Sequence, residues 1–260
     1  MTGDRPLAGK VAVIMGASGG IGAATARRLA AAGAQVVATY AGRQELAEQL
    51  VASLPAPAAV PAGQPQPGHL ALPARVEDSA SLAGLAVTVG ERFGKVDILV
   101  NSAGFTRPVP HADLEALDDE LIDRMFAVNW RGQFATVRVF RGLLEASGTG
   151  LIVNISSIAA LNGFGSNIAY CAVKAGIDAM TKSLARALAP KIRVLAVSPG
   201  VVRTGFVAGR DDAFNAAAGA QTPLRRVGEP EDVARAVEAC ATLLDYSTGA
   251  IILVDGGRAL

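Results

Sequence analysis

A short apolar run followed at once by a glycine-rich turn limits most strongly what this chain can fold into. Residues 11–15 (VAVIM) are apolar without interruption, which is typical of a strand buried on both faces of a parallel sheet. Residues 16–22 (GASGGIG) form the turn, and the alanine-rich residues 23–32 predict a helix that Gly33 ends. Residues 35–40 predict a second strand. This order predicts a βαβ unit whose two strands are parallel.

The glycine-rich turn predicts a dinucleotide site. Glycines permit a tight turn and let backbone N–H groups approach a pyrophosphate at the helix N-terminus. A turn of this kind between a strand and a helix favours dinucleotide binding over a purely structural role. We therefore expect cofactor contacts from Gly16, Ser18, Gly20, Ile21 and Gly22.

The end of the second predicted strand distinguishes between cofactors. An acidic residue there would bind the ribose 2′-hydroxyl of NAD, whereas an arginine can bind the 2′-phosphate of NADP. Residues 40–43 (YAGR) offer no acid before Glu45, and Arg43 is well placed for a phosphate. The sequence favours NADP(H), and it leaves NAD(H) open because Arg43 could also be a solvated loop cation.

The rest of the chain alternates between strand and helix patterns. Further apolar runs predict strands at residues 70–72, 96–100, 151–155, 193–197 and 250–254. Helical patterns separate them at residues 44–54, 79–93, 117–144, around Tyr170 and at 231–244. We predict an α/β fold, Rossmann-like and doubly wound, with a seven-stranded parallel sheet and helices on both faces. One domain is expected to span residues 1–260.

Two segments interrupt this alternation. Residues 55–68 are rich in proline, which forbids regular helix or central strand, so they predict an exposed surface loop. Residues 201–222 are polar, contain glycine and show no regular pattern. They predict a mobile lid over a substrate.

Composition excludes several classes of protein. Lysine and arginine (24) nearly balance aspartate and glutamate (23), so no basic surface for nucleic acid is expected. No apolar run reaches membrane-spanning length and no signal peptide is visible, which predicts a cytoplasmic protein without a membrane partner. Cys171 and Cys240 give no disulfide framework, and no metal-ligand spacing is present, so no metal site is expected.

Tyr170 and Lys174 form a candidate proton-transfer pair. They stand four positions apart in a predicted helix and therefore share a face. A nearby ammonium favours phenolate and would lower the pKa of Tyr170 towards neutral pH, as proton exchange with a carbonyl or alcohol oxygen requires. Ser156 and Ser157 follow a predicted strand and could add a hydroxyl. The pair alone also fits an ordinary surface tyrosine and lysine.

Four motifs in one order resemble those of the short-chain dehydrogenase/reductase family in its single-domain form. They are the turn at 16–22, Asn101-Ser102-Ala103-Gly104, the set Ser157 with Tyr170 and Lys174, and Pro199-Gly200-Val201-Val202-Arg203-Thr204. The resemblance covers nearly the whole chain, and within the family the chain is similar to the 3-oxoacyl-[acyl-carrier-protein] reductase branch. The thirteen positions from Ser157 to Tyr170 match the family spacing and select Ser157 over Ser156.

The resemblance implies a role for each matched residue. Tyr170 would be the general acid and base, Lys174 would lower its pKa and hold the nicotinamide ribose, and Ser157 would polarise the substrate carbonyl. Asn129 would hold a water that connects Lys174 to solvent. Further cofactor contacts would come from Asn101, Ala103, Gly104, Pro199, Gly200, Val202 and Thr204.

Three residues depart from the family pattern. Met15 replaces a threonine whose hydroxyl braces the glycine-rich turn, and Ser102 replaces a second asparagine. Arg75 stands where an aspartate would contact the adenine amino group. A guanidinium cannot accept that hydrogen bond, but it can stack on the ring.

The resemblance implies an NADP(H)-dependent oxidoreductase that interconverts a carbonyl and a secondary alcohol. A 3-oxoacyl thioester is the substrate that the branch implies, and relatives of this kind are commonly homotetramers or homodimers. The alternative is a catalytically silent dinucleotide sensor or scaffold on the same fold, since fold does not determine function. Retention of Asn129, Ser157, Tyr170 and Lys174 together favours the enzyme.

Overall fold

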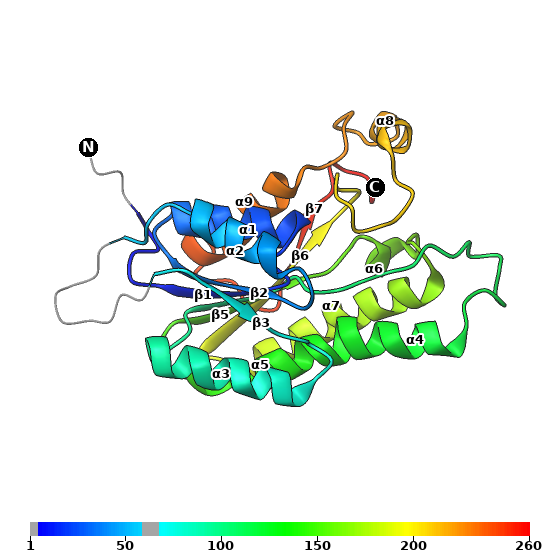
Figure 1. Ribbon diagram of the computed structural model, residues 1–260. Coiled ribbons are helices and arrows are strands. Elements are labelled where there is room, and N and C mark those ends of the chain that lie inside the picture. The colour runs from blue at the N-terminus through cyan, green and yellow to red at the C-terminus, as the bar shows by residue number, and fades with distance from the viewer. Residues whose placement is uncertain (1–4, 59–67) are drawn as a thin grey trace.

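The computed structural model describes residues 5–58 and 68–260. Within them, seven parallel strands form one sheet in the order β3-β2-β1-β4-β5-β6-β7 (Figure 1). The strands are β1 (Val11–Met15), β2 (Gln35–Tyr40), β3 (Leu70–Pro73), β4 (Ile98–Asn101), β5 (Gly150–Ile155), β6 (Ile192–Pro199) and β7 (Ile251–Val254). The predicted seven-stranded parallel sheet is confirmed.

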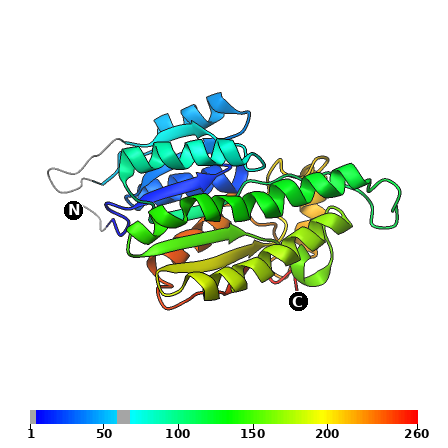
Figure 2. The ribbon, with the colours of Figure 1, turned by 90° about the horizontal axis from the view of Figure 1, so that it is seen from below.

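Helices cover both faces of the sheet, which confirms the doubly wound fold (Figures 1 and 2). One face carries α1 (Gly20–Ala31), α2 (Gln44–Ser53) and α9 (Pro230–Thr242), and the other carries α3 (Ser79–Phe93), α5 (Gly132–Ala146) and α7 (Ile168–Leu188). Two apolar cores result, one holding Leu29 and Val237, the other Leu82 and Phe140. Every residue of β1 and β5 is buried between them, which explains the uninterrupted apolar sequence of β1 and the largely apolar sequence of β5.

The predicted long helix over residues 117–144 is present, but it changes its winding in the middle. It comprises α4 (Asp119–Met125), a π-helical segment η1 (Phe126–Arg131) and α5, in direct succession. Asp118 caps its start by accepting a hydrogen bond from the Leu121 N–H. Asn129 lies within η1, where a π segment interrupts the regular hydrogen bonding of an α-helix.

The segment 201–222 is more regular than its sequence predicts. It contains the helix α8 (Asp212–Ala220), which Asp211 caps by accepting a hydrogen bond from the Phe214 N–H. The helix consists largely of alanine and glycine, so it carries no strong apolar period to read. A second short helix, α6 (Ala159–Asn162), lies between Ser157 and Tyr170.

The sequence also predicts a proline-rich surface loop at residues 55–68 and no membrane-spanning segment. Residues 59–67 of the predicted proline-rich loop at 55–68 lie outside the described residues. In the described part of the chain, no helix is long and apolar enough to cross a membrane.

The topology opens a crevice at one edge of the sheet. β1 and β4 are neighbours, and the chain leaves β1 for α1 on one face and β4 for α4 on the other (Figure 1). Connections that diverge in this way leave a crevice beyond the carboxyl ends of the strands, where open α/β sheets bind ligands.

Candidate active site

One cavity of about 930 Å³ occupies this crevice. Its wall combines the glycine-rich turn, the loops after β2 and β4, the end of β5, α7, and the segment after β6. Most of the residues predicted to bind a cofactor or substrate line it: Gly16, Ser18, Gly20, Ile21, Arg43, Ala103, Gly104, Ser157, Tyr170, Lys174, Pro199, Gly200, Val202 and Thr204. The topology thus brings together motifs that lie far apart in the sequence.

The glycine-rich turn forms a cradle that has no room for side chains. Gly16 has a φ of +79°, and a Cβ there would lie 2.8 Å from the Ala103 Cα. A Cβ on Gly22 would collide with the Gly16 carbonyl oxygen, so Gly22 acts by packing behind the wall rather than by lining it. No side chain caps the start of α1 at Gly19. The first N–H groups of that helix are therefore suited to a pyrophosphate, and the turn fits a dinucleotide.

Thr39 supplies a brace for this turn. The Gly16 N–H donates to the Thr39 Oγ1 at 3.1 Å, and the Ala17 N–H donates to the Thr39 carbonyl oxygen at 3.0 Å. Met15 itself is buried in the apolar core. The turn is therefore held from β2 although residue 15 has no hydroxyl.

Arg43 extends over the turn from the end of β2. A Cβ on Gly19 would lie 3.2 Å from the Arg43 Nη1 atom, so the guanidinium lies directly against the backbone that begins α1. The guanidinium forms no ion pair with a carboxylate of the described residues. It leaves a positive charge at the cavity wall that a phosphate could neutralise.

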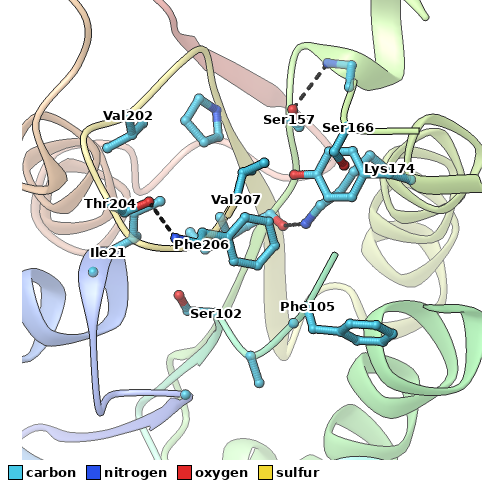
Figure 3. A pocket seen from close by; sticks show the side chains of 18 of the residues that line it. Ile21, Ser102, Phe105, Ser157, Ser166, Lys174, Val202, Thr204, Phe206 and Val207 are labelled. Atoms are coloured by element: carbon cyan, nitrogen blue, oxygen red, sulfur yellow. Dashed lines mark hydrogen bonds between the residues drawn. The ribbon is translucent and has the colours of Figure 1, made fainter. Parts of the chain in front are cut away.

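Ser157, Tyr170 and Lys174 all line this cavity, and Figure 3 shows Ser157 and Lys174 in its wall. Ser157 follows β5, its hydroxyl is close enough to the Tyr170 side chain to affect the Tyr170 pKa, and its Oγ accepts from the Ala159 N–H at 3.2 Å. The Lys174 Nζ lies 5.6 Å from the centroid of the Tyr170 ring and donates to the Ile155 carbonyl oxygen at 2.7 Å. The Ser156 hydroxyl instead donates to the Lys174 carbonyl oxygen. Contact with Tyr170 therefore belongs to Ser157.

The helix that carries Tyr170 begins at a side-chain cap. The Asn167 Oδ1 accepts from the Tyr170 N–H at 2.7 Å, and its Nδ2 donates to the Arg107 carbonyl oxygen at 2.7 Å. The loop before it contains Gly165, where a Cβ would lie 3.0 Å from the Tyr170 Cδ1. A buried asparagine and a glycine thus place the phenol at the cavity.

Burial, rather than charge pairing, dominates the titration of the two candidate proton-transfer groups. Burial raises the pKa of Tyr170 to about 12, against the opposing effects of the nearby Ser157 hydroxyl and the Arg210 charge. Burial likewise lowers the pKa of Lys174 to about 8, and the Asp178 carboxylate opposes that shift. The expectation of a lowered Tyr170 pKa is not met, because burial disfavours the charged form of each group. The phenol keeps its proton at neutral pH and is suited to donate it.

Two predicted site residues support the cavity wall from behind. The Asn129 Oδ1 accepts from the Phe105 N–H at 2.9 Å, and its Nδ2 donates to the Phe105 carbonyl oxygen at 2.8 Å. The Asn101 Nδ2 donates to the Asn154 Oδ1 at 2.9 Å, and its Oδ1 accepts from the Thr136 hydroxyl at 2.6 Å. Neither asparagine lines the cavity. Asn101 therefore ties β4 to its neighbours rather than contacting a ligand, and Asn129 holds the loop that follows β4.

The structure adds wall residues that the sequence motifs did not identify. Phe206, Phe214 and Gln221 come from the segment 201–222, which the sequence predicts as a lid, and Phe164, Ser166 and Arg258 come from other parts of the chain. Arg258 directly follows Gly256 and Gly257. The φ angles of these two glycines, +66° and +86°, turn the chain back after β7 and place Arg258 in the cavity wall. The paired glycines were the one visible signal of this turn. The others follow no motif and come together only through the fold.

Arg75 lies outside the cavity wall, although its neighbours Ala74, Val76 and Glu77 line it. Its guanidinium pairs with the Glu77 carboxylate at 3.2 Å, and its side chain is 66% exposed. Stacking of this guanidinium on an adenine is therefore not supported by the structure.

We expect Arg75→Ala to change the dissociation constant of NADPH by less than about twofold, because an exposed ion pair of this kind contributes little. Fluorescence titration of the variant and the unmodified protein measures this directly. A loss of affinity of tenfold or more would mean that the guanidinium swings into the cavity.

Comparison with known proteins gives a consistent result. The family model described as "Enoyl-(Acyl carrier protein) reductase" matches residues 16–259. A proposed ketoacyl reductase of the granaticin polyketide synthase from Streptomyces violaceoruber is 39% identical, over 100% of both chains. The cis-4-hydroxycyclohexanecarboxylate dehydrogenase of Sinomonas cyclohexanicum is 37% identical, over 95% of this chain and 96% of the relative. A crystal structure of a short-chain dehydrogenase/reductase from Brucella melitensis superposes with a TM-score of 0.85 at 30% identity, covering 97% of this chain and 98% of the other.

Proposed function

Because the chain belongs to the short-chain dehydrogenase/reductase family, we propose that it is an NADP(H)-dependent oxidoreductase that interconverts a carbonyl and a secondary alcohol. The observation that carries this proposal is the single cavity that joins the glycine cradle to Ser157, Tyr170 and Lys174. A dinucleotide in the cradle and a carbonyl beside Tyr170 would share one enclosed space. That arrangement is what hydride transfer between them requires.

The chain offers a distinct set of groups to each part of the cofactor. The first N–H groups of α1 and the Ser18 side chain would bind the pyrophosphate. Lys174 would hold the nicotinamide ribose, and the segment from Pro199 to Thr204 would border the nicotinamide. The bound nicotinamide supplies the hydride, and the remaining chemistry falls to the side chains of the protein.

Tyr170 handles the proton in this proposal. In the reductive direction its phenol donates the proton to the carbonyl oxygen, and in the oxidative direction its phenolate accepts the proton of the alcohol. The Ser157 hydroxyl binds the same oxygen and holds it in line with the phenol. The Lys174 ammonium stabilises the phenolate that remains after reduction.

The silent sensor or scaffold remains the competing proposal, and turnover distinguishes the two. We expect NADPH oxidation with at least some members of a panel of ketones and NADP⁺ reduction with the matching alcohols. Tight binding of NADPH without turnover of any member would favour the sensor. The Ser157 hydroxyl lies beside Tyr170 in the cavity wall, which supports the enzyme because a sensor has no need of that arrangement.

Arg43 is proposed to select NADP(H) over NAD(H). We expect Arg43→Ala to raise the KM for NADPH about 10-fold while leaving that for NADH nearly unchanged, since only NADPH carries the phosphate. Initial rates with both cofactors measure the change, and Arg27→Ala, which removes an exposed arginine of α1 outside the cavity, is the matched control. An equal effect on both cofactors would refute the assignment.

The substrate proposed from the branch resemblance is a 3-oxoacyl thioester. The granaticin relative is named a ketoacyl reductase, which supports the carbonyl as the reacting group. Acetoacetyl-N-acetylcysteamine tests this class without a carrier protein, and its reduction by NADPH at a rate above that of simple ketones would support it.

Assembly and location are also proposals. We propose a homotetramer in the cytoplasm. The assembly is supported by exposed apolar side chains on two separate elements: Phe126 and Phe134 on the long helix, and Leu253 on β7. The cysteines Cys171 and Cys240 are both free, as is usual in a reducing compartment. Sedimentation equilibrium of the purified protein determines the number of subunits.

A further inference from the structure

Arg210 brings a positive charge into the cavity beside Tyr170. It stands just before α8, lines the cavity wall and is half-buried. Its guanidinium carbon lies 4.9 Å from the centroid of the Phe214 ring, which holds the group by cation–π contact. The charge is close enough to Tyr170 to stabilise its phenolate. A cation therefore faces the space where the reacting oxygen must lie.

No carboxylate of the described residues pairs with this guanidinium. Other charges of the same region are paired: Arg203 binds Asp212 at 2.8 Å and Glu229 at 3.1 Å. The neighbouring Asp211 is occupied as the cap of α8. A half-buried arginine usually has an anionic partner, and Arg210 has none among the carboxylates of the described residues.

A second arginine, Arg258, reinforces the positive charge at this end of the cavity. Its guanidinium donates to the Ala218 carbonyl oxygen at 2.8 Å, and to Thr222 Oγ1 and Gln221 Oε1 at 3.4 Å each. These contacts fix its position in the wall. Burial lowers the pKa of Arg210, and repulsion from Arg258 adds to that effect. Two like charges that lie close together favour the binding of an anion.

We propose that the substrate is a small oxo acid, whose carboxylate is bound by Arg210 with support from the charge of Arg258 while its carbonyl oxygen meets Tyr170 and Ser157. A carboxylate suits this site better than a phosphate dianion, since the donors of Arg258 are already engaged and Arg210 alone offers a free fork of donors. Phe206, Val207 and Phe214 line the same end of the cavity and suit a short carbon skeleton between the two polar groups (Figure 3 shows the first two).

The inference rests on the proposed carbonyl reduction, and it names an oxo acid as the substrate class in place of the 3-oxoacyl thioester that the branch resemblance suggests. A hydride adds to the carbonyl carbon, the carbon–oxygen π bond breaks, and the oxygen takes the proton of Tyr170. The product is a hydroxy acid, and the carboxylate passes through the reaction unchanged.

The first test compares each oxo acid with its neutral ester. The substrates are 4-oxopentanoate and 4-oxocyclohexanecarboxylate, each against its methyl ester, with acetoacetyl-N-acetylcysteamine as a neutral thioester. We expect kcat/KM with NADPH to be about 10- to 100-fold higher for the acids, as for charge-assisted hydrogen bonds at a partly buried site. Arg210→Gln should bring the acid-to-ester ratio close to one. Arg225→Gln, which removes an exposed arginine outside the cavity, should leave the ratio as it was.

The second test measures binding without turnover. Isothermal titration of the protein–NADP⁺ complex, which cannot reduce a ketone, with 4-oxocyclohexanecarboxylate and with its amide should show tighter binding of the acid. Arg210→Gln should remove the difference. Equal or better use of the esters or of the thioester, with turnover intact, overturns the oxo-acid inference and leaves the proposed reduction standing. NADPH binding with no turnover of any of these compounds overturns the proposed reduction and the inference with it.

Discussion

Tyr170→Phe is expected to lower kcat for carbonyl reduction by about 10²- to 10⁴-fold, the range that a positioned general acid contributes. The substitution removes the hydroxyl and keeps the ring, which is tilted against Phe206 with centroids 6.1 Å apart. Packing of the cavity wall should therefore survive. Steady-state NADPH oxidation with the best ketone of the panel measures the loss, and fluorescence titration should show that NADPH still binds.

The control for this variant is Tyr246→Phe, which removes the hydroxyl of a fully exposed tyrosine outside the cavity. It should leave both turnover and binding unchanged. Turnover of Tyr170→Phe close to that of the unmodified protein would refute the proton-transfer role. Loss of NADPH binding together with turnover would instead show that the phenol holds the cofactor.

Among the described glycines, Gly22→Ala is expected to be the most damaging replacement by alanine. Its Cβ would collide with the Gly16 carbonyl oxygen and lie 3.0 Å from the Ala17 Cα. Both are backbone atoms that cannot rotate away, so the turn must open. We expect the free energy of unfolding to fall by about 1–3 kcal/mol and the dissociation constant of NADPH to rise at least about 10-fold. Urea denaturation and fluorescence titration measure the two effects.

Alanine variants at two other glycines distinguish backbone strain in the turn from loss of the surface that binds the cofactor. Gly84 lies in α3 with no atom within 4 Å of a Cβ, so Gly84→Ala should hold or raise stability and leave binding unchanged. Gly19 has extended backbone, and a Cβ there would meet only the flexible Arg43 guanidinium. Gly19→Ala should therefore fold normally and reduce the preference for NADPH. If Gly22→Ala behaved like Gly84→Ala, the cradle would be looser than its geometry indicates.

The fold could be predicted from sequence because its strands are buried on both faces. Such strands must be apolar at every position, as in residues 11–15, and they stand out without knowledge of their neighbours. The glycine-rich turn was equally visible, since close backbone approach leaves no other residue type for Gly16 and Gly22. The helix α8 was missed because its alanine-rich sequence carries little apolar period.

The sequence predicted which residues form the candidate site, but it did not predict the role of each one. The spacing of Ser157, Tyr170 and Lys174 predicted that they would meet, and the structure brings them together. The direction of the Tyr170 pKa could not be predicted, because it depends on burial by residues distant in the chain. The same holds for Asn101, whose side chain turns to Thr136 and Asn154 across the sheet. The charge of Arg210 gains its meaning only from the fold, which leaves its guanidinium without an ion pair to any carboxylate of the described residues.

Because of the π segment η1, the site depends on the number of residues in this long helix as well as on their types. A π segment carries one residue more than α-helical winding would use, which turns the helix on one side of it by about 100° relative to the other. On one side, Leu121 and Met125 of α4 pack with Val173 and Ile177 of α7; on the other, Phe140 of α5 packs under the sheet. Many side chains along this helix could be exchanged for others of similar size without altering that division. Loss of a single residue would rotate one half against the other, so a relative that lacks one position here would have to pack a different face of α4 against the helix that carries Tyr170.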